Sequence, residues 1–268
     1  MTETIERVTP AAVHPARVFR AVLYRDIFVT GREFVAFLLQ VLVQPLFLLF
    51  VFGKVLTQLG YAHANFTDVL FPGVVAFTAV LTGLQSCALP LVIDFSFTKE
   101  IEDRLLAPLP TSLVAVEKVV FAGLRGLVAA TVMFPLGVLV LGHVPFHASG
   151  VPLLVAALVL GPLVGATIGL TIGTAVQPSQ INIVFALVLT PLLFTGATQY
   201  PWPSLSSLRW FQVVTALNPL TYVSEAMRGA LVPEVPHIAP WICVVVMLAA
   251  VAVFMTTGIR GFGHRAID

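Results

Sequence analysis

The sequence predicts an all-α polytopic membrane protein with six transmembrane helices, and three observations support this prediction. Of its 268 residues, 58% are hydrophobic and 10% are charged, and the mean hydropathy is +1.00. Such values are typical of proteins embedded in membranes. Six apolar runs approach the ~20 residues that a helix needs to cross a hydrocarbon core of about 30 Å. Lys and Arg also gather in alternate connections between these runs.

Each expected span is a long apolar run of the sequence. The fifth is the shortest, and it follows a tight connection at 177–180. An even number of spans places both termini on the same side, and we treat residues 1–268 as one transmembrane domain. The expected spans are Phe34–Leu56, Val69–Ile93, Leu113–Leu141, Val151–Val176, Ile181–Thr198 and Ala239–Ile259.

The positions of the basic residues indicate the orientation. With a cytoplasmic N-terminus, the outer segments hold only Lys54, Arg209 and Arg228 of the 14 Lys and Arg residues. Inner segments are enriched in Lys and Arg. We therefore expect a multi-pass protein of the plasma (inner) membrane with both termini in the cytoplasm. The inner residues are Arg7, Arg17, Arg20, Arg25, Arg32, Lys99, Arg104, Lys118, Arg125, Arg260 and Arg265.

Residues 1–32 form a tail and an amphipathic segment, Ala16–Val29. On a helical wheel, its apolar residues occupy one half and Arg17, Arg20 and Arg25 occupy the other. A basic polar face opposite an apolar face predicts a helix that lies flat on the membrane surface. The apolar half contains Val18, Phe19, Val22, Leu23 and Ile27.

The connection at 94–112 carries a dense group of charges between the second and third spans. Five charges fall within six residues, and such a group cannot lie in hydrocarbon. Oppositely charged residues four apart favour a short helix, which Pro108 ends. One interpretation is a helix that docks to a soluble partner; the other is a solvated loop that only follows charge topology. The charged residues are Lys99, Glu100, Glu102, Asp103 and Arg104.

Within the fourth span, glycines recur every four residues. This repeat of GxxxG predicts close approach of another helix. Static packing is one interpretation, and a hinge or sliding surface is the other. The glycines are Gly161, Gly165, Gly169 and Gly173.

Two glutamines, Gln40 and Gln44, lie one turn apart in the first span, and we expect Phe37 and Phe47 on the same face. A side-chain amide in hydrocarbon needs a hydrogen-bond partner, so this face should point into protein or a cavity. The face forms either part of a substrate path or an interhelical hydrogen-bond pair. Further candidates for the path are Gln85, Asn182 and Phe185.

The region 199–238 is too interrupted by proline to form a span. We expect two short helices, Ser204–Ala216 and Pro219–Leu231, separated at Asn218 and Pro219. Their aromatic residues place them at the outer membrane interface or partly within it. Backbone at membrane depth must be buried in protein or face a water-filled cavity.

Motifs for catalysis are absent from the sequence. There is no GxxxxGK[ST] phosphate-binding loop and no HExxH pair, so we expect neither catalytic residues nor a metal site. Cys87 and Cys243 are isolated and give no disulfide framework. The net charge of +1 does not suggest a nucleic-acid partner. No carboxylate lies at the centre of a span, which disfavours a secondary transporter.

In two places the sequence resembles the permease subunits of type-2 ABC exporters. Asn218–Gly229, NPLTYVSEAMRG, is similar to the Asn-Pro-Leu-Thr-Tyr motif that precedes the last span in that family. Pro108–Val120, PLPTSLVAVEKVV, together with the charged segment before it, resembles the family's coupling region. The flat N-terminal helix and the six spans occur in the same order.

The resemblance implies a dimer of permeases, formed with a second copy or a paralogue, whose interface holds the transport path. It implies two cytosolic ABC ATPase subunits that bind ATP and Mg²⁺, with no cofactor on this chain. The ATPases would contact the N-terminal helix and Thr98–Ala107. The outer gate would comprise Asn218, Pro219, Tyr222, Glu225 and Arg228.

Within the family, the chain is most similar to short permeases for antibiotics, drugs or lipids, in contact with membrane lipids. One alternative is an exporter of a lipid-linked polysaccharide, which shares the fold. The other alternative is a secondary transporter or a membrane enzyme that works without an ATPase.

Overall fold

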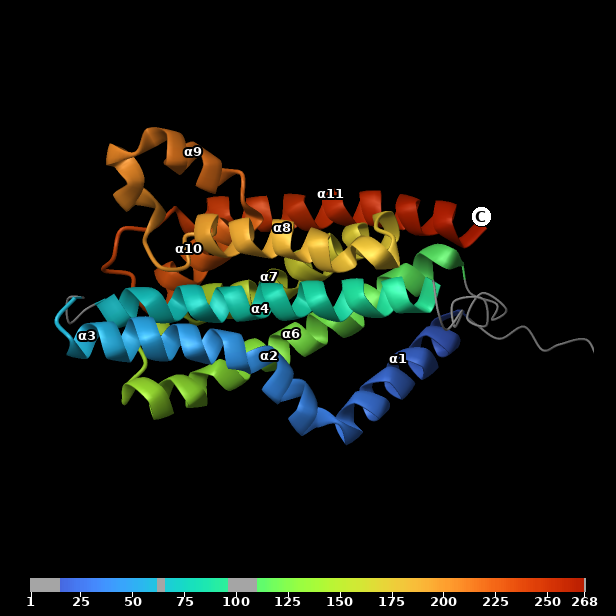
Figure 1. Cartoon of the computed structure of the whole chain (residues 1–268), viewed down its shortest axis with the longest axis horizontal. Coiled ribbons are helices and arrows are strands. Elements are labelled where there is room, and N and C mark those ends of the chain that lie inside the picture. The colour runs from blue at the N-terminus through green and yellow to red at the C-terminus, as the bar shows by residue number, and fades with distance from the viewer. Residues whose placement is uncertain (1–14, 62–65, 96–109, 268) are drawn as a thin grey trace, which may run out of the picture.

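The computed structural model describes residues 15–61, 66–95 and 110–267, and these ranges contain helices and no strand. Within these ranges, six helices are long and apolar enough to cross a membrane. Figure 1 shows them side by side in one elongated bundle. The all-α polytopic fold is therefore confirmed.

Local sequence explains where most helices begin and end, because Pro and Gly lie at their boundaries. α6 follows Pro110, and it ends at Gly142, whose φ of 84° places it in the left-handed region that Gly favours. The first span combines three helical elements, and short 3₁₀ turns precede α7, α8 and α9. The helices are α1 (Pro15–Arg32), α2 (Phe34–Leu48), η1 (Leu49–Val55), α3 (Leu56–Gln58), α4 (Phe66–Ile93), α6 (Thr111–Leu141), η3 (Ala148–Gly150), α7 (Val151–Ala175), η4 (Pro178–Gln180), α8 (Ile181–Thr195), η5 (Trp202–Ser207), α9 (Arg209–Ala216), α10 (Pro219–Leu231) and α11 (Pro240–Ile267).

The structure differs from several of the expected helices. α11 continues to Ile267, past the expected end at Ile259, because hydropathy marks only the apolar part of a helix. The expected helix Ser204–Ala216 is divided into the 3₁₀ turn η5 and the α-helix α9. The end of the first span contains the π-helix η1, where the Gly53 carbonyl accepts a hydrogen bond from Thr67 Oγ1 at 3.2 Å.

α4 lies at the centre of the bundle. Among the helices that the structure describes, its contact with α7 is the most extensive, and most of its residues are buried. α2 and α8 lie at the periphery, with far fewer buried residues. In Figure 1, α9 and α10 lie at one end of the bundle, and the end of α4, the start of α6 and the C-terminus lie at the other. We name these the α10 end and the C-terminal end.

Candidate functional site

Two predicted path residues meet in a cavity of about 260 Å³ between α2, α4 and α6. Gln40 comes from α2, Gln85 comes from α4, and Arg125 of α6 completes the wall. Gln40 is exposed in the single subunit, whereas Gln85 is half-buried. The remaining wall contains Val41, Ser86, Leu89, Pro90 and Ile93.

The other predicted path residues do not join this cavity. Phe37 is 5% exposed and Phe47 is 66% exposed, so the expectation that they share a face is wrong. Ten residues at ~100° each leave two helix positions about 80° apart, and the π-turns of η1 begin just beyond Phe47. Gln44 is exposed at the bundle surface. On α8, Asn182 is exposed and Phe185 is 8% exposed.

At the α10 end, Asn218 organises the start of α10. Its Oδ1 accepts a hydrogen bond from Leu220 N at 2.9 Å, which caps the helix. Its Nδ2 donates to Leu192 O at 3.0 Å and to Thr195 Oγ1 at 2.9 Å, both at the end of α8. Pro219 suits the first helical position because its missing N–H would have no helical partner there. The expected separation of the two short helices at Asn218 and Pro219 is thus a helix cap, and the Asn218 side chain also connects α10 to α8.

Asn218→Asp and Asn218→Ala separate the two roles of this side chain. Asp keeps the capping oxygen and loses the amide donor, whereas Ala loses both. We expect Ala to destabilise the protein by about 2–3 kcal/mol and Asp by roughly 1 kcal/mol less, because the cap is retained. Thermal unfolding of the detergent-solubilised protein measures the difference. If both variants lowered the stability equally, the capping role of Asn218 would be contradicted.

Glu225 and Arg228 form an ion pair inside the subunit, and both side chains are 0% exposed. Glu225 accepts hydrogen bonds from Trp202 N at 3.0 Å and from Ile238 N at 2.9 Å. Arg228 Nη2 donates to Ala197 O at 2.9 Å and to Val69 O at 3.3 Å. Burial lowers the pKa of Arg228, and the Glu225 carboxylate opposes this shift.

This pair joins α10 to four other segments: η5, the turn after α8, the start of α4 and the connection to α11. Within one subunit the two side chains therefore attach α10 to its neighbours and are closed off from solvent. Tyr222 has a similar part, because its hydroxyl donates to Ala216 O at 2.9 Å at the end of α9. Burial raises the pKa of this hydroxyl, which stays protonated as a donor.

At the C-terminal end, two polar contacts hold neighbouring helices together. Lys118 of α6 forms a buried salt bridge with Asp94, just after α4, at 3.0 Å. Arg265 of α11 donates to Gly173 O at 3.0 Å and to Val176 O at 2.9 Å at the end of α7. The salt bridge joins the end of α4 to α6, the two helices on either side of the connection predicted to contain the coupling helix.

Of the residues predicted to dock an ATPase, Arg17, Arg20 and Arg25 are exposed along α1. The other five lie outside the described residues: Lys99, Glu100, Glu102, Asp103 and Arg104.

The sequence pattern that characterises the ABC-2 type transporter family matches residues 17–232, which extend from α1 to the end of α10. The chain belongs to this family. The inner membrane transport permease YadH of Escherichia coli (strain K12) is 29% identical over 223 residues, covering 81% of this chain and 84% of YadH. The transport permease ycf38 of Cyanophora paradoxa is 27% identical over 215 residues, covering 77% of this chain and 72% of ycf38.

Membership establishes the kind of molecule to which this geometry belongs. The chain is the permease of an ABC-2 transporter, a multi-pass transport subunit whose ABC ATPase is a separate chain. The matched region includes the capped helix α10 and, at the C-terminal end, the end of α4 and the start of α6, whereas α11 lies beyond it.

The glycine row of the permease lies along the centre of the bundle. A Cβ added at Gly165 would overlap the Val80 carbonyl of α4, and one at Gly169 would overlap the Leu84 carbonyl. At Gly173 the nearest atom would be Leu91 Cβ at 3.0 Å. Gly161 instead faces Val223 of α10. The four glycines therefore allow α7 to approach both α4 and α10.

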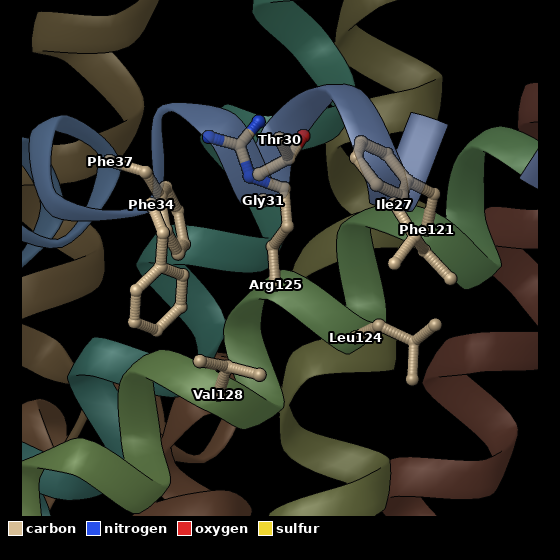
Figure 2. Close-up of a pocket in the computed structure, with 9 residues that line it drawn as sticks. All are labelled: Ile27, Thr30, Gly31, Phe34, Phe37, Phe121, Leu124, Arg125 and Val128. Atoms are coloured by element: carbon tan, nitrogen blue, oxygen red, sulfur yellow. The ribbon is translucent and has the colours of Figure 1, made fainter. Parts of the chain in front are cut away.

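Arg125 is the main feature that the sequence analysis did not identify as part of the site. Its guanidinium carbon lies 4.2 Å from the centre of the Phe37 ring and 5.9 Å from that of Phe121. These three side chains line a second cavity, of about 170 Å³ (Figure 2). The signal was present in the sequence, because a basic residue inside an apolar span is itself a candidate functional residue. The other residues that line this second cavity are Ile27, Thr30, Gly31, Phe34, Leu124 and Val128.

Proposed function

We propose that this permease is the membrane part of an ATP-driven exporter for a hydrophobic or amphipathic substrate, such as a drug, an antibiotic or a lipid. Two permeases, either identical or paralogous, would assemble with two ATPase subunits. ATP and Mg²⁺ would bind on the ATPases, and the C-terminal end would face the cytoplasm. The substrate would leave the cytoplasm or the inner leaflet and pass outward.

The observation that carries this proposal is that the single helix α4 is attached to neighbouring helices at both ends of the bundle. At the C-terminal end, Asp94 just after α4 is fixed to Lys118 of α6. At the other end, the Val69 carbonyl of α4 accepts hydrogen bonds from Arg228 of α10. About 25 residues at ~1.5 Å each separate these points, a span of roughly 38 Å. In the proposed mechanism, α4 would carry a displacement near Asp94 to α10 through these two attachments.

The unpacked faces of α2 and α8 support assembly with a second permease. Both helices have large apolar side chains that no part of the described subunit covers. In the bilayer either lipid or a partner helix can cover them, and the proposed dimer would cover at least one face. The exposed side chains include Val35, Leu39, Val43 and Phe47 on α2 and Ile183, Leu187 and Phe194 on α8.

The double substitution Glu102→Gln and Asp103→Asn tests the proposed docking. It removes two acidic charges and retains the size of both side chains. If these residues contact the ATPase, the amount of ATPase that co-purifies should fall about tenfold or more, because interfacial charge pairs of this kind contribute strongly. ATP-dependent export by the reconstituted complex should fall with it.

Glu234→Gln is the matched control, because Glu234 is exposed in the connection before α11, near the opposite end of the bundle. It should leave both readouts unchanged. Unchanged ATPase co-purification and export in the double variant would contradict the docking assignment. Uphill transport by the permease reconstituted without any ATPase would contradict the proposed function as a whole.

A further inference from the structure

Arg125 lies deep within α6, far from either end of that helix. It follows Thr111 by 14 residues and precedes Leu141 by 16, which places its Cα about 21 Å along the helix axis from the start. Its side chain is half-buried, and Figure 2 shows it rising from α6 toward the part of α1 that contains Thr30 and Gly31.

The guanidinium has no anionic partner among the residues that the structure describes. Its Nε is buried without a hydrogen bond, and no ion pair joins it to a described carboxylate. Arg has five N–H donors and no acceptor, and an unpaired buried charge is costly. The rings of Phe37 and Phe121 offset part of the charge but accept no conventional hydrogen bond. The donors of Arg125 therefore remain available to an anion.

Two cavities of different polarity meet at Arg125. One contains the polar side chains Gln40, Gln85 and Ser86, whose amide and hydroxyl groups can donate to an oxyanion. The other is lined by alkyl and aromatic side chains, apart from Thr30 and Arg125 itself. A cation between a polar and an apolar cavity matches the two halves of an anionic amphiphile.

The position of Arg125 relative to the membrane agrees with this match. Its apolar cavity lies beside the junction of α1 and α2. α1 has exposed basic residues and α2 is an apolar span, so this junction marks the boundary between headgroups and hydrocarbon. Basic side chains extend toward this boundary from within a membrane.

We propose that Arg125 binds the anionic headgroup of an amphiphile, with Gln40 and Gln85 as additional donors and the alkyl chain in the cavity lined by Ile27, Phe34 and Phe121. The headgroup is a phosphate or carboxylate. Its source is either a resident membrane lipid or the exported substrate, and only the second possibility rests on the proposed function.

The test uses the full-length permease, without an ATPase, in phosphatidylcholine nanodiscs that contain a trace of spin-labelled phosphatidylglycerol. Electron paramagnetic resonance measures the fraction of label that the protein immobilises, and spin-labelled phosphatidylcholine gives the reference. Wild type should prefer phosphatidylglycerol. Arg125→Gln should reduce this preference about tenfold, the equilibrium equivalent of one hydrogen bond to a charged group.

Arg260→Gln is the matched control, because Arg260 is an exposed arginine near the C-terminal end of α11 and should leave the preference unchanged. Ile27→Trp fills the apolar cavity while retaining Arg125 and should also reduce binding, which provides a second variant if Arg125→Gln folds poorly. Absence of a preference in wild type, or equal losses in Arg125→Gln and Arg260→Gln, would overturn the proposal.

A second arm distinguishes the two sources of the ligand. Proteoliposomes containing the permease and its ATPase receive fluorescent phosphatidylglycerol, and a membrane-impermeant quencher reports movement between leaflets on addition of ATP. Movement that Arg125→Gln abolishes assigns the site to the substrate. Binding without movement assigns it to a resident lipid, and both results support the site. Failure of the proposed function would remove ATP-dependent movement and leave the nanodisc result unchanged.

Discussion

Replacement of Arg228 with Met is expected to destabilise the permease by about 3–5 kcal/mol, because it leaves the Glu225 carboxylate buried without its cationic partner. The same change removes the donors to Val69 O and Ala197 O. α10 would then lose its polar attachment to α4 and to the turn after α8. We expect low yield and a large decrease in the unfolding temperature.

A double-mutant cycle separates the ion pair from the other contacts. Glu225→Gln, Arg228→Met and the double variant are compared by thermal unfolding in detergent. The double variant should be less destabilised than the sum of the single changes, because it contains neither unpaired charge. Arg209→Met is the control, because Arg209 is exposed on α9 and should have little effect. If the destabilisations caused by the changes at positions 225 and 228 were additive, the two side chains would not interact.

The boundaries that local chemistry determines were predictable from the sequence. α10 begins and ends where expected, because Asn218 and Pro219 specify a capped start without help from distant residues. The six spans were predictable because length and apolarity suffice to identify a membrane helix. The end of α11 was not, because its last turns are polar and Arg265 attaches to carbonyls at the end of α7.

The contacts of the site depend on segments that are far apart in the sequence. Nothing near Glu225 indicates that its carboxylate accepts hydrogen bonds from Trp202 N and Ile238 N. The presence of Gln40 and Gln85 in the wall of one cavity likewise depends on how α2 packs against α4. The π-turns of η1 could not be predicted from the hydropathy pattern, because the run around them is apolar on nearly every side and shows no clear periodicity.

A graded series of Gly→Ala substitutions is expected to show how closely α4 and α7 pack. At Gly165 the new methyl would overlap the backbone carbonyl of Val80, which cannot move aside without moving α4. At Gly165 we expect the free energy of unfolding to fall by about 2–3 kcal/mol. At Gly173 the nearest atom would be Leu91 Cβ at 3.0 Å, so a loss of about 1 kcal/mol is expected. Unfolding in a denaturing detergent titration measures both.

Gly263→Ala is the matched control, because it makes the same chemical change in α11 where nothing lies within 4 Å of the added methyl. It should be neutral or stabilise the protein by up to about 1 kcal/mol, as Ala favours a helix more than Gly does. The expected change in the free energy of unfolding therefore has opposite signs at Gly165, where the added methyl meets backbone, and at Gly263, where it meets open space. Equal effects at the three positions would mean that helix propensity, and not the approach of α7 to α4, explains the glycine row.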